Sequence, residues 1–362
     1  MTASAPAPIR TRLTDLTGIR YPIVQTGMGF VAGPRLVSAT SAAGGLGIIG
    51  SASMTLDALR AAITEVKSRT DAPFGVNLRA DAPDSAERIE LMISAGVRVA
   101  SFALAPKQDT IRRLKDAGVI VIPSVGARRH AEKVAEWGAD AVIAQGGEGG
   151  GHTGPIPTSL LIPQVAAAVD IPVVAAGGYY DGRGLVAALA YGAEGIAMGT
   201  RFLLTTDSPV ADQVKQFYLG KTLTDTVVTT RVDGVPHRVL RTQLIEGLER
   251  SGQLRGLARA ARNAAGFRKL SGLSWADLIR QGHAMRQATE LSWSQVLMAA
   301  NTPMLLKAAM VDGRPDLGVM AAGQVVGVIE DVPSCADLIG RIMAEAHDCL
   351  ARLGKLGGAD PG

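Results

Sequence analysis

The sequence of 362 residues predicts an α/β fold, a (β/α)8 TIM barrel with a mostly helical insertion or cap after its eighth strand. Three observations carry this prediction. Short apolar runs alternate with helical patterns up to about residue 205, eight such runs can be counted, and glycines stand between several helical patterns and the strands that follow them. A parallel sheet that is closed into a barrel and covered by helices has this organisation.

The eight expected strands are apolar almost throughout, as is typical of strands covered on both faces. They are Pro22–Gln25, Leu46–Ile49, Phe74–Asn77, Arg98–Ser101, Val119–Ile122, Ala141–Ala144, Pro172–Ala175 and Gly195–Met198. Between them lie amphipathic patterns of helical spacing, such as Leu56, Leu59, Ile63 and Val66. Glycine is the usual left-handed residue at a helix end, and it ends four of these patterns, at Gly96, Gly118, Gly138 and Gly192.

The domain organisation follows from where this rhythm stops. Residues 13–205 are expected to form the barrel, and residues 206–304 a mostly helical cap or insertion with a short β-like piece at Thr226–Leu240. Residues 305–353 are expected to return to the barrel and to end in a closing helix from Ser334 to Leu353. Because barrels are elaborated where their strands end, we expect the cap to lie over the barrel mouth.

Composition argues against several classes of protein. A net charge of +4, with basic residues spread along the chain, gives no reason to expect a nucleic-acid partner. The start, Met1–Arg12, has no apolar core of a signal peptide, and no run of about 18 apolar residues could span a membrane. Cys335 and Cys349 are too far apart for a metal or redox motif. We therefore expect a cytoplasmic protein with reduced thiols.

The active site of a barrel is assembled from residues that directly follow its strands. Two such loops, Ala176-Gly177-Gly178 and Gly199-Thr200, follow the seventh and eighth strands, where barrels often hold phosphate through bare backbone N–H groups. Glycines that merely turn the chain are the alternative interpretation. Their occurrence in both loops favours a phosphorylated ligand.

His152 is the leading candidate for a catalytic acid or base. It follows a glycine-rich loop after the sixth strand, Gln145 to Gly151, and imidazole exchanges a proton near neutral pH. A histidine that only packs in the core is the alternative. The sequence has no pair of histidines at helical spacing and no cysteine cluster, so no metal site is expected.

Five motifs make the sequence resemble the nitronate monooxygenase family over about residues 13–329. They are Gln25-Thr26-Gly27-Met28, Gly75-Val76-Asn77, the run from Gln145 to Gly154, Ala175-Ala176-Gly177-Gly178 and Met198-Gly199-Thr200-Arg201-Phe202. The family includes nitronate monooxygenases, enoyl-thioester reductases and quinone reductases. The resemblance therefore implies an FMN-dependent oxidoreductase more firmly than it implies one reaction.

By this resemblance FMN lies across the barrel mouth. The residues implied around its isoalloxazine ring are Gln25, Gly27, Met28, Asn77 and Gln145, and those around its phosphate are Ala176, Gly178, Gly199 and Thr200. Gly151, Gly177 and Met198 complete the expected cofactor-binding set.

A narrower resemblance points to the actinobacterial branch linked to breakdown of steroid rings C and D. It rests on Gly147 to Gly154, Thr229 to Gly234 and Trp293 to Met304. It implies that His152 handles a proton while N5 of FMN accepts a hydride, with a bicyclic β-keto acyl-CoA as the substrate to be oxidised. Weaker candidates for contacting such a substrate are Arg79, Lys107, Arg128, Arg231 and His237.

Three other functions stay open at this point. They are oxidation of alkyl nitronates with O2, reduction of a quinone or enoyl thioester by NAD(P)H, and ligand binding by a phosphate-binding barrel without turnover. The expected partners are a small-molecule substrate, with a CoA thioester as the leading choice, and a second copy of the chain in a homodimer. No membrane or nucleic-acid partner is expected.

Overall fold

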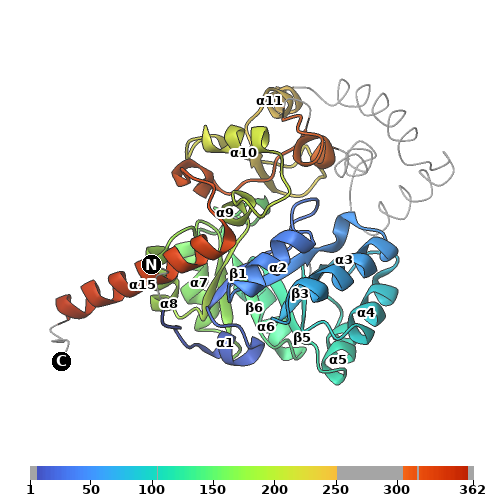
Figure 1. Ribbon diagram of the computed structural model, residues 1–362, viewed down its shortest axis with the longest axis vertical. Helices are drawn as coiled ribbons and strands as arrows, with labels where there is room; N and C mark the ends of the chain where they lie inside the picture. The colour runs from blue at the N-terminus through green and yellow to red at the C-terminus, as the bar shows by residue number, and fades with distance from the viewer. Residues whose placement is uncertain (1–5, 104, 251–304, 316–317, 358–362) are drawn as a thin grey trace. The chain divides into compact units, whose positions relative to one another are not determined.

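The computed structural model describes residues 6–103, 105–250, 305–315 and 318–357, which fall into two compact units (Figure 1). The first unit comprises Met1–Gly149, Gly154–Pro209 and Val328–Gly362. The second comprises Gly150–Thr153 and Val210–Gly327. Residues 251–304 of the expected cap lie outside the described residues, and so does the motif from Trp293 to Met304.

The first unit is the predicted (β/α)8 barrel, with eight parallel strands in a closed ring. Each expected strand occurs within a few residues of its predicted position. In order around the barrel they are β1 (Ile23–Gln25), β2 (Leu46–Gly50), β3 (Phe74–Leu78), β4 (Val99–Phe102), β5 (Ile120–Val125), β6 (Val142–Gln145), β8 (Val173–Ala176) and β9 (Gly195–Met198). Val24 of β1 pairs with Leu46 of β2 and Ala197 of β9, which closes the ring.

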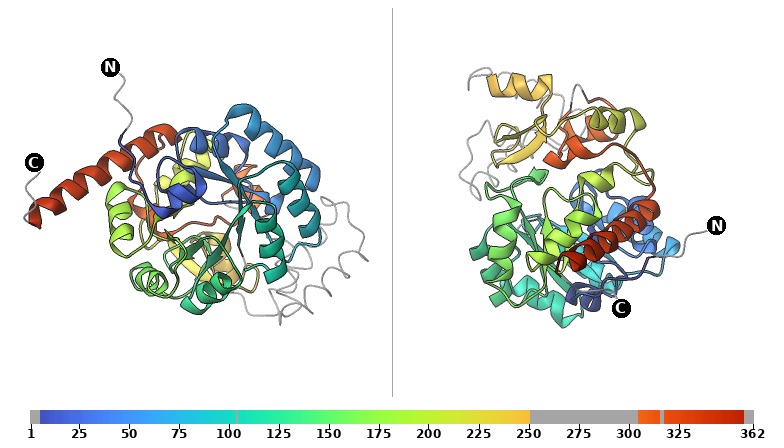
Figure 2. Two further views of the ribbon diagram at one scale, coloured as in Figure 1. Left: turned by 90° about the horizontal axis from the view of Figure 1, so that it is seen from below. Right: turned by 90° about the vertical axis from the view of Figure 1, so that its left-hand side faces the viewer.

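Helices surround these strands, as the view along the barrel shows (Figure 2, left). They are α2 (Pro34–Ala42), α3 (Leu56–Arg69), α4 (Ser85–Ser94), α5 (Gln108–Asp116), α6 (Arg128–Glu136), α7 (Thr158–Ala166), α8 (Gly182–Ala190) and the short α9 (Thr200–Leu203). Two of these helices begin at a side-chain cap. The Thr55 side chain accepts a hydrogen bond from the Ala58 amide at the start of α3, and the Asp181 side chain accepts one from the Gly184 amide at the start of α8. The four glycines expected at helix ends all have positive φ, between 66° and 94°.

The barrel interior is filled by side chains from the strands, including Ile48, Val99, Ile122 and Val174. Helix α1 (Arg12–Thr17) precedes the first strand and adds Leu13 to this core. Its capping box, in which Thr11 and Thr14 bond each other's backbone amides, fixes where this helix begins. The interior is therefore a packed core, as in other barrels.

The closing helix predicted at Ser334–Leu353 is α15 (Cys335–Leu356), with Ser334 as its N-cap. It packs against α8 and α2 of the barrel (Figure 1). Asp331 precedes it and bonds two guanidinium groups, at 2.9 Å from Arg201 and 2.7 Å from Arg341. Since the Arg201 side chain is only 2% exposed, this ion pair ties the return of the chain to the barrel interior.

The second unit contains a three-stranded antiparallel sheet in the order β10–β11–β7. The β-like piece predicted at Thr226–Leu240 forms its hairpin, β10 (Thr226–Thr229) and β11 (His237–Leu240), while β7 (Gly151–His152) comes from the glycine-rich loop. Helices α10 (Asp212–Leu219) and α11 (Gln243–Arg250) belong to the same unit. No helix among the described residues combines the length and apolar character that a membrane crossing requires.

Candidate active site

The expected cofactor-binding residues of the barrel gather at one end of it, where the strands terminate. Gln25 pairs with Met198, and Ala176 pairs with both Gln145 and Ala197. Asn77 pairs with Gly50 at the same end and donates from Nδ2 to Ser101 Oγ at 3.1 Å. The strand order thus brings together residues up to 173 positions apart in the sequence.

This end of the barrel is built by very close packing of backbone. A Cβ on Gly27 would lie 2.4 Å from Asn77 Cβ, and one on Gly50 would lie 2.3 Å from the Met28 carbonyl oxygen. A residue other than glycine cannot be accommodated at either position unless the neighbouring chain moves. The loop after β1 is consequently held tightly against β2 and β3.

Thr158 fits between the loops that follow β6 and β8. A Cβ on Gly146 would lie 2.1 Å from Thr158 Oγ1, and one on Gly177 would lie 2.9 Å from it. Glu148 accepts hydrogen bonds from the Thr158 amide at 2.9 Å and from its hydroxyl at 2.6 Å, at the start of α7. Part of the glycine content of these loops is thus explained by packing.

Two glycines after β8 have a backbone that other residues rarely adopt. Gly177 and Gly178 have φ of 103° and 83°. Among the described residues, a Cβ on Gly178 would meet only the Cβ of Glu148, at 3.8 Å, so these residues leave the space beside Gly178 open. Gly199, after β9, lies beside Thr26 and Met28. The two loops expected to hold phosphate therefore present bare backbone.

The cations proposed to contact substrate are spread over both units. Arg79 follows β3 and is paired with Asp81 at 2.7 Å, and Arg128 at the start of α6 is paired with Glu132 at 2.7 Å. Lys107 precedes α5 and is exposed. Arg231 lies in the hairpin turn of the second unit. Three of these cations thus belong to the first unit and one to the second.

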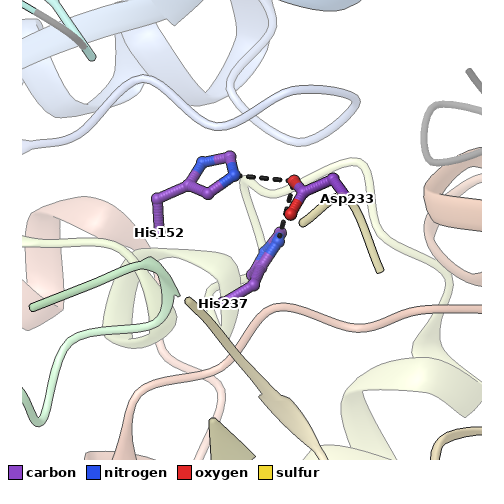
Figure 3. Close-up of side chains that lie close together, drawn as sticks. All are labelled: His152, Asp233 and His237. Carbon is purple, nitrogen blue, oxygen red and sulfur yellow. Dashed lines mark hydrogen bonds and ion pairs between the residues drawn. The ribbon is translucent and has the colours of Figure 1, made fainter. Parts of the chain in front are cut away.

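His152 lies in a cluster with Asp233 and His237, all within the second unit (Figure 3). Nε2 of His152 is 2.7 Å from Oδ2 of Asp233, and Nδ1 of His237 is 3.5 Å from the same oxygen. The two imidazole rings are 4.6 Å apart between centroids and tilted by 38°. The His152 side chain is 55% exposed, whereas those of Asp233 and His237 are 13% and 6% exposed.

Strand pairing explains why these residues meet. β7 pairs with β11 so that His152 lies directly opposite His237, which projects both side chains from one face of the sheet. Asp233 lies in the turn of the β10–β11 hairpin, four residues before His237. His152 is the only one of the three that sequence analysis singled out as catalytic, and His237 was expected only as a weak substrate contact.

The carboxyl group of Asp233 is held in its ionised form. Burial favours the neutral acid, but the hydrogen bond from His152 and the electrostatic effect of the adjacent His152 and His237 imidazoles outweigh this and hold the pKa of Asp233 well below its usual range. The carboxylate is thus available as a hydrogen-bond acceptor for the adjacent imidazoles at neutral pH.

Asp233 was not among the predicted site residues, although it lies inside one motif of the narrower resemblance, Thr229 to Gly234. The available signal was the Asp233-Gly234 dipeptide between two β-like runs, which is typical of a hairpin turn. No rule of spacing connects such a turn to His152, which is 81 residues earlier in the chain.

The ligand atoms of these three residues lie within 4.8 Å of one another, a spacing that a metal ion could bridge. Two ligands of a tetrahedral zinc ion would be roughly 3.3 Å apart, given bonds of about 2.0 Å. The 2.7 Å contact between His152 and Asp233 is shorter and has the length of a hydrogen bond. The expected absence of a metal site stays a prediction.

Comparison with known proteins identifies the family of this chain. The family model for nitronate monooxygenase matches residues 10–345. The chain belongs to the nitronate monooxygenase family. It is an oxidoreductase, and as a member of this family it is expected to use a flavin.

Two bacterial relatives are similar over nearly their whole length. One, from Mycobacterium tuberculosis, is 65% identical over 93% of this chain and 96% of its own. The other, from Rhodococcus jostii, is 61% identical over 96% of this chain and 99% of its own. Both are named (3aS,4S,5R,7aS)-5-hydroxy-7a-methyl-1-oxo-octahydro-1H-indene-4-carboxyl-CoA dehydrogenase.

A solved structure agrees with the fold. FabK from Thermotoga maritima superposes with a TM-score of 0.78 at 36% sequence identity, covering 96% of this chain and 99% of that one. The predicted barrel is therefore confirmed both by its own strand order and by a structural neighbour.

The residues at the barrel end fit a flavin in two respects. Gln25 Oε1 is buried and has no hydrogen-bond donor among the described residues, while the Nε2 of the same amide donates to the Ile48 carbonyl at 3.2 Å. A buried acceptor requires a donor, and a flavin ring carries an N–H group that could supply one. Bare backbone at Gly178 offers space for a phosphate in the loop after β8.

Proposed function

We propose that this chain is an FMN-dependent dehydrogenase of a steroid-derived bicyclic acyl-CoA, acting in steroid ring degradation. The observation that carries the proposal is 65% identity, over 93% of the chain, to a relative with that kind of substrate in its name. The geometry is compatible with it, because one exposed imidazole, that of His152, is held by a buried carboxylate.

The names of the relatives define the bond that would be oxidised. They specify a hydroxyl on C5 next to C4, the carbon that carries the thioester. Removal of hydrogen from that C–OH group gives a ketone β to the thioester. We therefore propose a β-hydroxy acyl-CoA as substrate, which places the β-keto acyl-CoA expected from the sequence on the product side.

The roles of individual residues follow from this chemistry. FMN, when bound, supplies a hydride acceptor at N5. The imidazole of His152 receives the hydroxyl proton as the C–O bond gains double-bond character. Gln25 and Asn77 would hold the ring of the cofactor, and the backbone after β8 and β9 would hold its phosphate. Those assignments at the barrel end are part of the proposal.

The CoA portion of the substrate carries several negative charges. We propose that Arg79, Lys107, Arg128 and Arg231 contribute to its recognition through long-range attraction, since each is a cation on an exposed segment. Arg79 and Arg128 would first have to exchange their carboxylate partners, Asp81 and Glu132. His237 is buried against His152, so we assign it no direct contact with substrate.

An anaerobic absorbance titration of FMN-loaded protein tests the proposal. A bicyclic 5-hydroxy acyl-CoA of the kind named above is expected to bleach the flavin, whereas 2-nitropropane nitronate and NADH are not. Bleaching by nitronate alone would replace the proposal by nitronate oxidation, and fast bleaching by NADH alone would replace it by an NAD(P)H-dependent reductase. Colourless protein that takes up no flavin would leave only a ligand-binding barrel.

We also propose a homodimer in the cytoplasm. Sedimentation of the flavin-loaded protein tests the oligomeric state, because a species of about twice the 37.5 kDa chain mass is expected. A single species at the mass of one chain would contradict the homodimer.

A further inference from the structure

The imidazole of His152 is held from two directions by residues that sequence analysis did not place in the reaction. Asp233 contacts its Nε2 at 2.7 Å, and the ring of His237 lies beside its own ring at 4.6 Å between centroids. Both partners are mostly buried, whereas the His152 side chain is half exposed. The arrangement is that of an exposed proton-exchanging group on a rigid support.

The carboxylate of Asp233 is itself fixed through both of its oxygens. Oδ1 accepts a hydrogen bond from the Val235 amide at 3.2 Å, within the hairpin turn, while Oδ2 faces His152. The turn is closed by a bond from the Gly234 amide to the Thr230 carbonyl at 3.0 Å, and Gly234 has a positive φ of 88°. The direction of Oδ2 is thus set by backbone geometry.

An ionised carboxylate only accepts hydrogen bonds, so the 2.7 Å contact requires a proton on Nε2 of His152. In the neutral imidazole the lone pair is then on Nδ1. With the opposite tautomer, two lone pairs would face each other across this short distance. Asp233 therefore selects which ring nitrogen can accept a proton from substrate.

We propose that Asp233 and His237 are positioning residues that make Nδ1 of His152 the proton acceptor. Asp233 fixes the tautomer, and it stabilises the imidazolium that forms when His152 takes up a proton. The inference rests on the proposed function for the identity of the proton donor, the substrate hydroxyl. The choice of tautomer does not depend on any substrate.

His237 helps to position His152 mainly through the packing of its ring. Its Nδ1 is 3.5 Å from Asp233 Oδ2, which is long for a hydrogen bond, and it has no hydrogen-bond partner among the described residues. Its position opposite His152 is fixed by strand pairing, which a bond from the Thr153 amide to the Pro236 carbonyl at 3.1 Å extends. The flat face of His237 thereby restricts the orientation of the His152 ring.

Nitrogen NMR of protein carrying ¹⁵N-labelled histidine tests the tautomer directly, since protonated and unprotonated ring nitrogens have well-separated shifts. Wild-type His152, assigned by loss of its signals in His152→Gln, is expected to carry its proton on Nε2. In Asp233→Asn the amide can turn its NH2 group toward Nε2, and a mixture or the opposite tautomer is expected. A proton on Nδ1 in the wild type, or an unchanged tautomer in Asp233→Asn, would overturn the proposal.

Stopped-flow reduction of the flavin by the acyl-CoA substrate gives the second readout. Asp233→Asn is expected to slow reduction about a hundredfold or more, with substrate KM and FMN affinity changed by no more than about twofold. Asp225→Asn is the matched control, because Asp225 lies in the same unit and its carboxylate accepts hydrogen bonds from the amide and hydroxyl of Thr222. A loss in Asp233→Asn that appears only in KM would contradict a positioning role.

Two variants separate the ring of His237 from its nitrogen atoms. His237→Phe keeps a flat ring and is expected to retain at least about a third of the reduction rate, whereas His237→Ala is expected to lose about tenfold or more. Equal losses in the two variants would contradict the stacking role. If the acyl-CoA fails to reduce wild-type flavin at all, the proposed function fails while the NMR result still decides the tautomer.

Discussion

A Cβ on Gly182 would lie 2.3 Å from the amide nitrogen of Ala346, so α8 and α15 meet with backbone against backbone. Gly182→Ala must push the closing helix away and is expected to cost about 1–3 kcal/mol in the free energy of unfolding. Gly340→Ala is the matched control within α15, because its Cβ would meet no atom of the described residues within 4 Å. That change should raise the free energy of unfolding by up to about 1 kcal/mol, because alanine favours the helical conformation more than glycine does. Equal urea midpoints for the two variants would contradict this account.

The carboxylate of Asp331 is expected to make stability depend on acid pH. A hydrogen bond from Arg341, together with the charges of Arg201 and Arg341, outweighs burial and lowers the pKa of Asp331 in the folded protein. The ionised Asp331 carboxylate therefore makes its full contribution to the free energy of unfolding above the ordinary aspartate pKa of about 3.9. This contribution is lost as pH falls through the lower pKa that Asp331 has in the folded protein.

Urea unfolding of wild type and Asp331→Asn at a series of pH values checks this sign. We expect a difference of about 2 kcal/mol above pH 5, because Arg201 is left buried without its anion, and a shrinking difference below about pH 4. Asp109→Asn is the control, since the Asp109 side chain is 93% exposed. A difference between wild type and Asp331→Asn that is constant down to about pH 2 would refute the assignment.

The loop after β8 is expected to be sensitive to a single methyl group. Gly177→Ala introduces a Cβ at φ of 103° and within 2.9 Å of Thr158 Oγ1, which should distort the backbone at a cost of about 1–2 kcal/mol. If this loop holds the FMN phosphate, the purified variant should carry much less flavin than wild type by absorbance. Gly126→Ala, whose Cβ would meet nothing within 4 Å in the part of the chain that the structure describes, should keep its flavin. Full flavin content in Gly177→Ala would remove the loop from the cofactor site.

Removal of the imidazole of His152 should affect the rate of flavin reduction and leave the flavin bound. His152→Gln is expected to reduce this rate between about a hundredfold and ten thousandfold, as is typical for loss of a general base. His130→Gln, on the exposed part of α6, is the control and should react at the wild-type rate. A His152→Gln enzyme of normal rate would show that the proton leaves by another route.

The barrel was predictable because its local signals agree with its tertiary structure. Strands such as Ile120–Val125 are covered on both faces and are apolar throughout, and glycines such as Gly96 and Gly118 adopt the left-handed conformation that ends a helix. Each signal is contained in fewer than ten consecutive residues. Closure of the ring then follows from the number of strands.

The cluster around His152 was only partly predictable. A glycine-rich loop indicated His152, but β7 is two residues long and gives no periodic signal. Its partner β11 begins 85 positions later, and pairing over such a distance is decided by the fold as a whole. The contact between His152 and Asp233, which lies in the hairpin turn that precedes β11, could therefore not be predicted from the sequence.

The chain leaves the barrel at Gly149 and rejoins it at Gly154, and in those four intervening residues it contributes β7 to the other unit. His152, the proposed proton acceptor, is thus encoded inside the barrel's own sequence, whereas its hydrogen-bond partner Asp233 is encoded in the insertion. Neither segment alone carries both members of this hydrogen-bonded pair. Exchange of the insertion for another would remove the Asp233 partner of His152, whereas all eight barrel strands are encoded outside the insertion.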